Sequence, residues 1–344
     1  MKTRMVYLAG PRELEIVECE IPRLKDNEIL VRVISSGLCH SDIPAYLGIS
    51  TKGVNKLGNR TMAEKFSYPE PIGHEAMGVV VEAGKGVKRF KAGDYCGGAK
   101  IGAFCDYLVS GEEFFHPIPK DTRNIKHCLV EPLSCVVNIV KTARPQFGDY
   151  VAVIGCGFMG LLILAGLKYK GLRELIAIDL IPERLELAKK MGATTTIQPG
   201  ENDVEQVIYD LTGNHGVDVV IEITGSLKGL EIACAIVRNA DYFGYKGRGR
   251  ILIPSLYGKP ESWNPKLGYD LMFKSPDLIS AHPWYSMDVA EDARQGIWAY
   301  SEGILPLDSL ITHTFKLEDI KEGFEMMANS SKEMLKGIVT FDGL

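Results

Sequence analysis

Val151-Ala152-Val153-Ile154-Gly155-Cys156-Gly157-Phe158-Met159-Gly160 is the stretch that decides the fold, because an apolar run leads directly into three glycines spaced G-x-G-x-x-G. The apolar run is typical of a buried strand, and residues 159–170 have the pattern of a helix. Between a strand and a helix, the first two glycines allow a tight turn and a close approach of pyrophosphate, and the third lets the helix pack on the strand. Free N–H groups at the helix start can bind phosphate. The stretch therefore predicts a dinucleotide-binding unit.

A carboxylate follows at the end of the next predicted strand, where such a unit needs one. Asp179 ends the apolar run 175–179 and lies 19 residues after Gly160. It can accept hydrogen bonds from ribose hydroxyls and would repel a 2′-phosphate, which favours NAD over NADP. Arg184 leaves two alternatives open, since it could flank the adenine or meet a phosphate. The residues expected to contact the cofactor are Gly155, Gly157, Phe158, Met159, Gly160, Asp179, Arg184 and Thr224.

Two domains are expected from the way the pattern changes along the chain. Residues 1–134 are rich in glycine, proline and short β-like runs, which is typical of antiparallel β structure. From about residue 149, predicted strands alternate with predicted helices, which indicates a parallel sheet. We therefore expect an α/β protein with a catalytic β domain over 1–134, completed by 275–344, and a doubly wound, Rossmann-type domain over 135–274 that binds NAD.

Composition excludes several classes of function. The formal net charge of −5 argues against nucleic acid or an anionic membrane as the main partner. The sequence has no apolar run near the ~20 residues of a membrane span, and we expect no secretory signal. Eight cysteines in 344 residues do not resemble a secreted disulfide framework. A cytoplasmic protein fits these features best.

Three short motifs before the glycine loop carry metal-binding residue types. They are Gly37-Leu38-Cys39-His40-Ser41-Asp42, Gly73-His74-Glu75 and Glu131-Pro132-Leu133-Ser134. A thiolate, an imidazole and carboxylates can hold Zn²⁺ with one exchangeable position, which a catalytic zinc needs. Taken singly, a cysteine is usually a small buried apolar residue, and a His-Glu pair usually makes ordinary hydrogen bonds. Only the combination predicts a metal site.

In this order, and with the glycine loop and Asp179, the motifs resemble those of the zinc-dependent medium-chain alcohol and polyol dehydrogenases. The resemblance covers essentially the whole chain, and the Glu-Pro-Leu-Ser form leans towards the polyol and sugar-alcohol branch. It implies a GroES-like β domain, a Rossmann domain, one catalytic Zn²⁺ per chain and NAD. It also implies a small alcohol or ketone as substrate and a homodimer or homotetramer.

The same resemblance implies a role for each residue of the motifs. Cys39 and His74 match protein ligands of zinc. Glu75 and Glu131 match positions that bind the metal directly, bind it through water, or exchange as the site changes state, and the sequence does not say which is the direct ligand. The two remaining residues are expected to be catalytic: Asp42 matches a carboxylate that orients the imidazole, and Ser41 matches a hydroxyl that passes on the substrate proton.

Departures from the family pattern carry further predictions. The stretch that often holds a structural zinc offers only Cys96 and Cys105, too few for a Cys₄ site. Extra length over 48–71 is either a lid or substrate loop or a tolerated surface insertion. Pro44 stands where some relatives have a relay histidine, which puts the later proton path in doubt. Candidates for the substrate pocket, with burial in the core as the alternative, are Tyr46, Phe104, Trp284 and Tyr285.

The predicted function is NAD-dependent oxidation of a secondary alcohol, polyol or sugar-derived, to a ketone or aldehyde. Two alternatives stay open at this point. One is an enzyme of the same fold acting on a larger hydroxyl- or carbonyl-bearing ligand, as bacteriochlorophyllide dehydrogenases do. The other is a non-catalytic nucleotide-binding protein, against which the metal-binding motifs argue. The sequence names neither the substrate nor the physiological direction.

Overall fold

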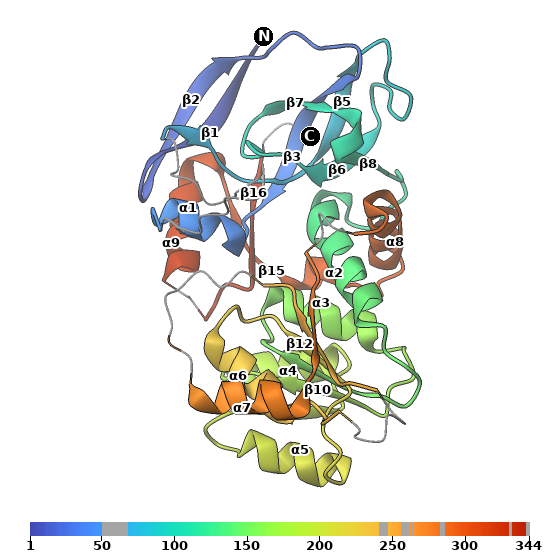
Figure 1. Cartoon of the computed structure of the whole chain (residues 1–344). Helices are drawn as coiled ribbons and strands as arrows, with labels where there is room; N and C mark the ends of the chain where they lie inside the picture. Colours follow the sequence, from blue (N-terminus) through green and yellow to red (C-terminus); the bar gives the residue numbers. More distant parts are fainter. Residues whose placement is uncertain are drawn as a thin grey trace. The chain divides into compact units, whose positions relative to one another are not determined.

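The computed structural model consists of two compact units. It describes residues 1–49, 68–240, 247–255, 262, 264–282, 286–329 and 332–341. The first unit comprises Met1–Leu133, Gly296–Glu302 and Leu307–Leu344, and the second comprises Ser134–Gln295 and Gly303–Pro306. The helices and strands carry the labels of Figure 1. Helices α2 (Val130–Ala143) and α8 (Val289–Ser301) contain residues of both units.

The first unit is built from two sheets. One has the strand order β2-β1-β4, and the other is seven-stranded with the order β15-β16-β3-β5-β6-β8, β7 pairing with β3. All of their pairings are antiparallel except that of β15 with β16. The strands are β1 (Lys2–Gly10), β2 (Glu13–Glu20), β3 (Glu28–Gly37), β4 (Glu70–Pro71), β5 (Glu75–Ala83), β6 (Tyr95–Ala99), β7 (Tyr107–Gly111), β8 (Phe115–Ile118), β15 (Ile311–Phe315) and β16 (Lys336–Thr340).

Strand β3 is the centre of the larger sheet, and the first predicted metal-binding motif begins at its end. It pairs with β5, β7 and β16, and its apolar residues, such as Val31 and Val33, are buried in the core of the unit. Its last residue, Gly37, lies opposite Glu75 of β5 and Ile338 of β16. Three segments far apart in the sequence are thereby fixed at one place.

The C-terminal segment completes the core of the first unit. Phe324 of α9 (Ile320–Ala328) is fully buried, with its ring centroid 5.0 Å from that of Tyr46 in α1 (Ile43–Tyr46) and 6.0 Å from that of Phe104. Tyr46 and Phe104 are themselves fully buried, so the prediction that they line a substrate pocket is wrong and their burial in the core is confirmed. Trp284 and Tyr285 lie outside the described residues.

Cys96 and Cys105 belong to the apolar core around β3. Both are fully buried among apolar side chains such as Val31 and Phe115. Burial raises the pKa of each thiol well above its usual range. Buried thiols of this kind behave as small apolar residues.

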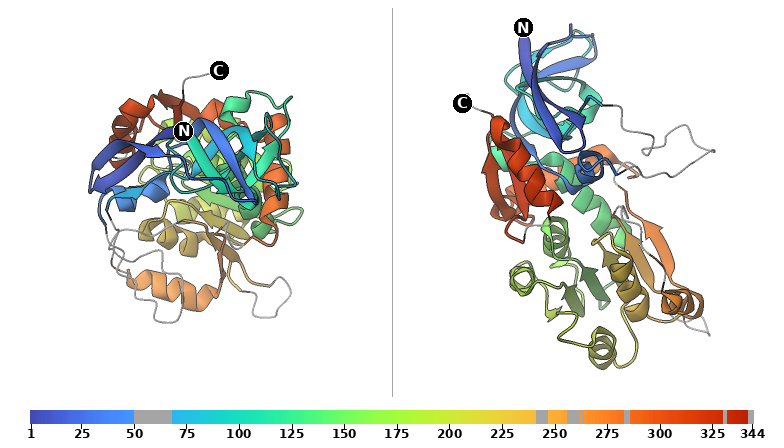
Figure 2. Two further views of the ribbon diagram at one scale, coloured as in Figure 1. Left: turned by 90° about the horizontal axis from the view of Figure 1, so that it is seen from above. Right: turned by 90° about the vertical axis from the view of Figure 1, so that its left-hand side faces the viewer.

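The second unit is a doubly wound α/β domain. Its six strands are all parallel in the order β11-β10-β9-β12-β13-β14. The strands are β9 (Tyr150–Ile154), β10 (Glu174–Ile178), β11 (Thr195–Ile197), β12 (Val219–Glu222), β13 (Arg250–Ile253) and β14 (Asp277–Ser280). The helices between them are α3 (Phe158–Leu167), α4 (Pro182–Lys190), α5 (Val204–Thr212), α6 (Leu227–Ile236) and α7 (Pro265–Lys274). Of these, α6 and α7 lie side by side (Figures 1 and 2).

The chain reverses its direction of winding at β9, the strand that precedes the glycine loop. From β9 it winds outward to β10 and β11, then returns to β12 on the other side of β9. Ligands of such sheets bind at this reversal, beyond the carboxyl ends of the strands. The expected α/β fold class is confirmed. Strand β14 pairs with β13, so the second unit continues to Gln295, past residue 274 where we expected the domain to end.

Candidate functional site

Two of the three predicted metal-binding motifs meet at the end of β3. Cys39 follows β3 by two residues, His74 precedes β5, and Glu75 is the first residue of β5. The antiparallel register places Gly37 opposite Glu75 and thereby joins the two strand ends. One ligand atom of each residue (the Cys39 sulfur, a His74 ring nitrogen and a Glu75 carboxylate oxygen) lies within 4.8 Å of the other two. This is the one such group of three or more among the residues that the structure describes.

Asp42 orients the imidazole of His74. Its Oδ1 lies 3.2 Å from His74 Nδ1, and it is held in the 3₁₀ helix His40–Asp42, which directly follows Cys39. With Nδ1–H donated to this carboxylate, Nε2 is the ring nitrogen left for a metal, which would displace the proton from Nε2 on binding. Ser41 lies beside both ligands: its Oγ donates to Cys39 Sγ at 3.3 Å and is 3.5 Å from His74 Nε2.

Negative charge dominates the surroundings of His74. Burial lowers the pKa of His74, but the hydrogen bonds and charges of Asp42 and Cys39 outweigh burial and raise it to about 12. The same charges favour any cation placed among these groups. A thiolate, an imidazole nitrogen and a carboxylate are also the donor types of catalytic zinc sites. The residues present therefore fit Zn²⁺.

Glu75 is buried and bound to a residue that the sequence did not suggest. Both of its carboxylate oxygens accept hydrogen bonds from Lys336 Nζ, at 2.7 and 2.6 Å. Lys336 is the first residue of β16 and is itself buried. Burial lowers the pKa of Lys336, but the negative charges of Glu75, Cys39 and Glu131 outweigh it and raise the pKa. The sequence marks Lys336 only as a charged residue at the start of the apolar run 336–341, which does not identify its partner.

Glu131 lies near the cluster without being part of the group of three. It is the second residue of α2, and its charge acts on Lys336. Of the two carboxylates that the sequence left undecided, the structure thus brings Glu75 together with Cys39 and His74 and places Glu131 within electrostatic reach of the Lys336–Glu75 pair.

The glycine loop has the geometry that the G-x-G-x-x-G spacing suggests. Gly155 has a φ of +101°, which favours glycine. A Cβ at Gly160 would lie 1.9 Å from the carbonyl oxygen of Gly155, so only glycine allows α3 to approach the loop this closely. A Cβ at Gly157 would meet no atom within 4 Å, so the space above this residue is open. Phe158 and Met159 form the first turn of α3, where N–H groups face that space.

Asp179 lies next to the glycine loop and accepts hydrogen bonds from backbone N–H groups there. Its Oδ2 accepts a hydrogen bond of 2.6 Å from the N–H of Cys156, and its Oδ1 accepts one of 2.9 Å from Ile181 N. Each oxygen retains a lone pair for a further donor such as a ribose hydroxyl. Arg184 lies on the adjacent helix α4 with its Nε buried and without a hydrogen-bond partner. Its charge reaches Cys156 in the loop.

Thr224 is held against the first glycine of the loop by a buried carboxylate. The backbone N–H of Thr224 donates to Glu222 Oε1 at 2.8 Å, and its Oγ1 donates to the same oxygen. A Cβ at Gly155 would lie 2.9 Å from Thr224 Cγ2. The ends of β9 and β12 are thus packed against each other at the point where the sheet reverses.

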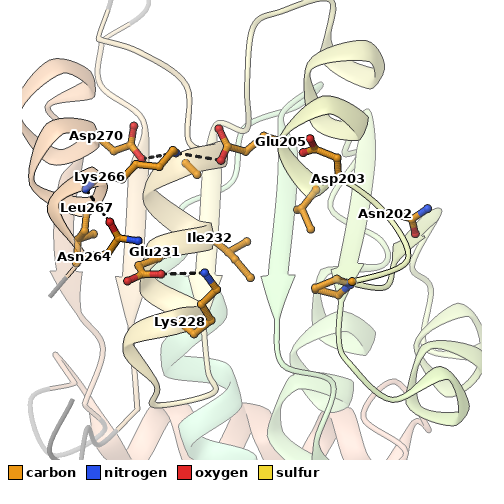
Figure 3. Close-up of a pocket in the computed structure, with 14 residues that line it drawn as sticks. Asn202, Asp203, Glu205, Lys228, Glu231, Ile232, Asn264, Lys266, Leu267 and Asp270 are labelled. Carbon is orange, nitrogen blue, oxygen red and sulfur yellow. Dashed lines mark hydrogen bonds and ion pairs between the residues drawn. The ribbon is translucent and has the colours of Figure 1, made fainter. Parts of the chain in front are cut away.

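A hollow of about 290 Å³ lies elsewhere on the second unit, lined by the amino-terminal parts of α5 and α7 and by one side of α6 (Figure 3). Its lysines are paired with its carboxylates: Lys228 with Glu231 at 3.0 Å, and Lys266 with both Glu205 and Asp270 at 2.9 Å. The predicted metal and cofactor residues are not part of its lining. It therefore does not form part of the candidate site.

Two predicted features fall partly or wholly outside the described residues. Of the extra length over 48–71, residues 50–67 are not described. Among the described residues, no helix is long and apolar enough to cross a membrane.

Comparisons with known proteins agree with this geometry. The family model "Alcohol dehydrogenase GroES-like domain" matches residues 25–120, and "Zinc-binding dehydrogenase" matches residues 159–251. The chain is 30% identical to an erythritol/L-threitol dehydrogenase of Mycolicibacterium smegmatis, over 97% of this chain and 96% of the relative. It is 28% identical to the sorbitol dehydrogenase of Bacillus subtilis, over 98% and 97%.

Solved structures give the same result. The structure of 2R,3R-butanediol dehydrogenase from Bacillus subtilis superposes with a TM-score of 0.79 at 26% identity, covering 99% of this chain and all of that one. Galactitol-1-phosphate dehydrogenase from Escherichia coli, at 22% identity, shows the fold alone, with a TM-score of 0.82 over 98% of this chain and all of that one. The predicted family is confirmed. The chain belongs to the zinc-dependent medium-chain alcohol and polyol dehydrogenases, and is an enzyme of alcohol oxidoreduction with Zn²⁺ as a cofactor.

Proposed function

We propose that the protein oxidises a secondary hydroxyl group of a small polyol to a ketone, with NAD as the hydride acceptor. The observation that carries this proposal is the cluster of Cys39, His74 and Glu75, in a chain whose relatives include erythritol/L-threitol and sorbitol dehydrogenases. When bound, Zn²⁺ supplies a Lewis acid that makes a substrate hydroxyl more acidic.

The residues of the cluster and its neighbours have separate roles in metal binding and proton transfer. Cys39 Sγ, His74 Nε2 and Glu75 hold the metal, while Asp42 fixes the tautomer of His74 through the contact of 3.2 Å. Ser41 is placed to relay the hydroxyl proton of the substrate, accepting it at Oγ while giving its own hydroxyl proton to water, since its Oγ lies within 3.5 Å of both Cys39 Sγ and His74 Nε2. Glu131 neutralises part of the positive charge near Lys336.

The glycine loop binds the NAD pyrophosphate in this proposal. The open space above Gly157 admits phosphate oxygens to the N–H groups of Phe158 and Met159. Asp179 accepts a ribose hydroxyl beside its two backbone donors and repels a 2′-phosphate. Arg184, whose charge acts on Cys156 in the loop, is assigned to the adenosine side of the cofactor, and Thr224 packs against Gly155.

The enzyme works in the cytoplasm and as a homo-oligomer. All eight cysteines are free thiols, which suits a reducing compartment. Tyr269, Met272 and Phe273 of α7 are each more than 60% exposed, and Leu278 of the neighbouring strand β14 is half exposed. Because β14 is the edge strand of the described sheet, a second copy of the chain can pair with it and cover these side chains.

The test is a substrate screen of the zinc-loaded protein with NAD, followed through the absorbance of NADH. Four-carbon and six-carbon polyols and vicinal diols are compared with simple primary alcohols and with bulky cyclic hydroxyl compounds. The proposal predicts the highest kcat/KM for a polyol or diol. Turnover confined to bulky substrates would favour the alternative of a larger ligand, and binding of NAD with no turnover on any substrate would favour a non-catalytic protein.

A further inference from the structure

The pair formed by Lys336 and Glu75 is the most deeply buried ion pair among the described residues. The side chains are 4% and 1% exposed. The three donors of the Lys336 ammonium have three acceptors: Glu75 Oε1 at 2.7 Å, Glu75 Oε2 at 2.6 Å and the carbonyl oxygen of Leu38 at 2.9 Å. Lys336 therefore contacts a metal-binding carboxylate and also the residue that precedes the metal-binding Cys39.

The carboxylate of Glu75 occupies space that is free only because residue 37 is a glycine. A Cβ at Gly37 would lie 1.9 Å from Glu75 Oε2 and 3.0 Å from Leu129 Cδ1. The carboxylate thus rests against the backbone at the end of β3, with Lys336 as a partner. Its position is fixed by the absence of a side chain at residue 37 as well as by the ion pair.

The same carboxylate is one of the three ligands of the metal cluster. A carboxylate has about four lone-pair sites, so Glu75 can accept from an ammonium and a metal ion at the same time. A cation on one side of the group withdraws charge from the bond on the other side. The charges of Cys39 and Glu131 also act on Lys336, so this lysine lies within the field of the whole anionic cluster.

We propose that Lys336 is a positioning residue that shares the Glu75 carboxylate with the metal and thereby limits how strongly Glu75 coordinates it. A weakly held carboxylate leaves a coordination position exchangeable, which the entry of a substrate hydroxyl requires. This inference rests on the proposed function, since it takes Cys39, His74 and Glu75 to be the metal site.

The experiment measures Co²⁺ binding to the metal-depleted full chain, because Co²⁺ absorbs visible light in a way that depends on its ligands. Affinity comes from competition with a chelator, and ligand geometry comes from the d–d bands. The variants are Lys336→Met, Lys336→Arg, Glu75→Gln and the double variant Glu75→Gln/Lys336→Met. Removing one partner of a buried pair can prevent folding, so Lys336→Gln, which keeps an N–H donor without the charge, is added as a second variant that removes the charge.

Loss of the Lys336 charge is expected to strengthen Co²⁺ binding about tenfold and to change the d–d bands. The reason is that Glu75 no longer shares its negative charge with an ammonium and coordinates the metal more strongly. Lys336→Arg should stay close to wild type in both readouts. In the Glu75→Gln background the effect of Lys336→Met should fall below about twofold, because the shared group is gone.

Two results would overturn the role of Lys336. One is an unchanged affinity and spectrum in Lys336→Met or Lys336→Gln. The other is an effect of equal size with and without Glu75, which would mean that the lysine acts on the metal by its charge alone. Failure of the wild-type chain to bind Co²⁺ would instead contradict the metal site and the proposed function with it.

Discussion

At the scale of single residues, the site depends on side chains that fix other side chains. The Asp42 carboxylate contacts the His74 ring, and the Lys336 ammonium donates hydrogen bonds to the Glu75 carboxylate and to the carbonyl oxygen of Leu38. Neither Asp42 nor Lys336 is a ligand in the proposed site, but each limits the positions that a ligand can take. Partners of this kind commonly affect metal affinity by one to two orders of magnitude.

Asp42→Asn tests this dependence. An asparagine can donate its amide N–H to His74 Nδ1, which would move the ring proton to Nε2 and remove the lone pair that the metal needs. We expect the zinc affinity to fall about 10- to 100-fold with little loss of fold stability. The measurement is zinc binding in competition with a chelator, beside thermal unfolding of the metal-free form. An unchanged zinc affinity would mean that His74 does not depend on Asp42.

Asp179→Ala tests the choice of cofactor. The substitution removes a hydrogen-bond acceptor for the ribose, a repulsive charge against a 2′-phosphate and an acceptor for Cys156 N–H. NAD should bind about ten- to a hundred-fold more weakly, and the preference for NAD over NADP should shrink. Dissociation constants for both nucleotides, measured by titration, decide the matter. A wild-type protein that already prefers NADP would refute the proposed role of Asp179.

At the scale of elements, strand ends and helix starts place the functional groups. Alternating apolar strands and helices, with glycines after β9, were enough to predict the parallel sheet and its class. Lys336 could not be predicted from the sequence, because its contact with Glu75 joins residues 261 positions apart through the pairing of β16 with β3. Tyr46 and Phe104 were candidates for a substrate pocket because, in a loop-rich sequence, the pattern of residues does not indicate whether an aromatic side chain is buried in the core or lines a pocket.

The glycine loop offers a matched pair of substitutions. Gly160→Ala places a methyl group 1.9 Å from the Gly155 carbonyl oxygen, so α3 must shift and the free energy of unfolding should fall by about 1–3 kcal/mol. Gly157→Ala meets no protein atom within 4 Å, so stability should change little while NAD binding weakens. Urea unfolding and NAD titration of both variants test this, and equal stability losses in the two would contradict the geometry of the loop.

His116 of β8 gives the β unit a dependence on pH. Burial and the nearby charge of Arg89 lower the pKa of His116 from 6.5 to about 4. Below its unfolded pKa, the unfolded chain binds a proton that the folded chain resists, so this residue makes stability fall as the pH drops from about 6.5 to about 4. One proton gives a slope of at most about 1.4 kcal/mol per pH unit.

Replacing the residue should remove that part of the slope. We expect His116→Leu to lose less stability than wild type between pH 7 and pH 5, measured by urea unfolding of the metal-free forms. A variant with the same pH dependence as wild type would show that another group is responsible.

At the scale of the whole molecule, the two units divide the proposed chemistry: the first carries the proposed metal ligands, and the second carries the glycine loop. Variants in one unit are therefore expected to spare the function of the other. The assignment of the chain to its family rests on both units, since the GroES-like match covers residues 25–120 and the zinc-binding dehydrogenase match covers residues 159–251.

The proposed oligomer predicts a specific effect of charge on α7 and β14. The double variant Phe273→Lys/Leu278→Lys places two charges on the exposed apolar face and should dissociate the oligomer, because a buried unpaired charge is costly. Analytical ultracentrifugation gives the mass of each form. Phe147→Lys is the control, since Phe147 is 93% exposed and belongs to neither element. A wild-type protein that sediments as a monomer, or a double variant of wild-type mass, would contradict the proposed interface.

Zinc content per chain tests the central claim most directly, that Cys39, His74 and Glu75 form the metal site. Inductively coupled plasma mass spectrometry on wild type should give about one zinc per chain, as one three-residue cluster with an exchangeable position implies. Cys39→Ala and His74→Ala should contain little zinc and show no turnover but still bind NAD, whereas Cys96→Ala, which changes a buried thiol outside the cluster, should keep its zinc. Full zinc occupancy and normal turnover in Cys39→Ala would contradict the account.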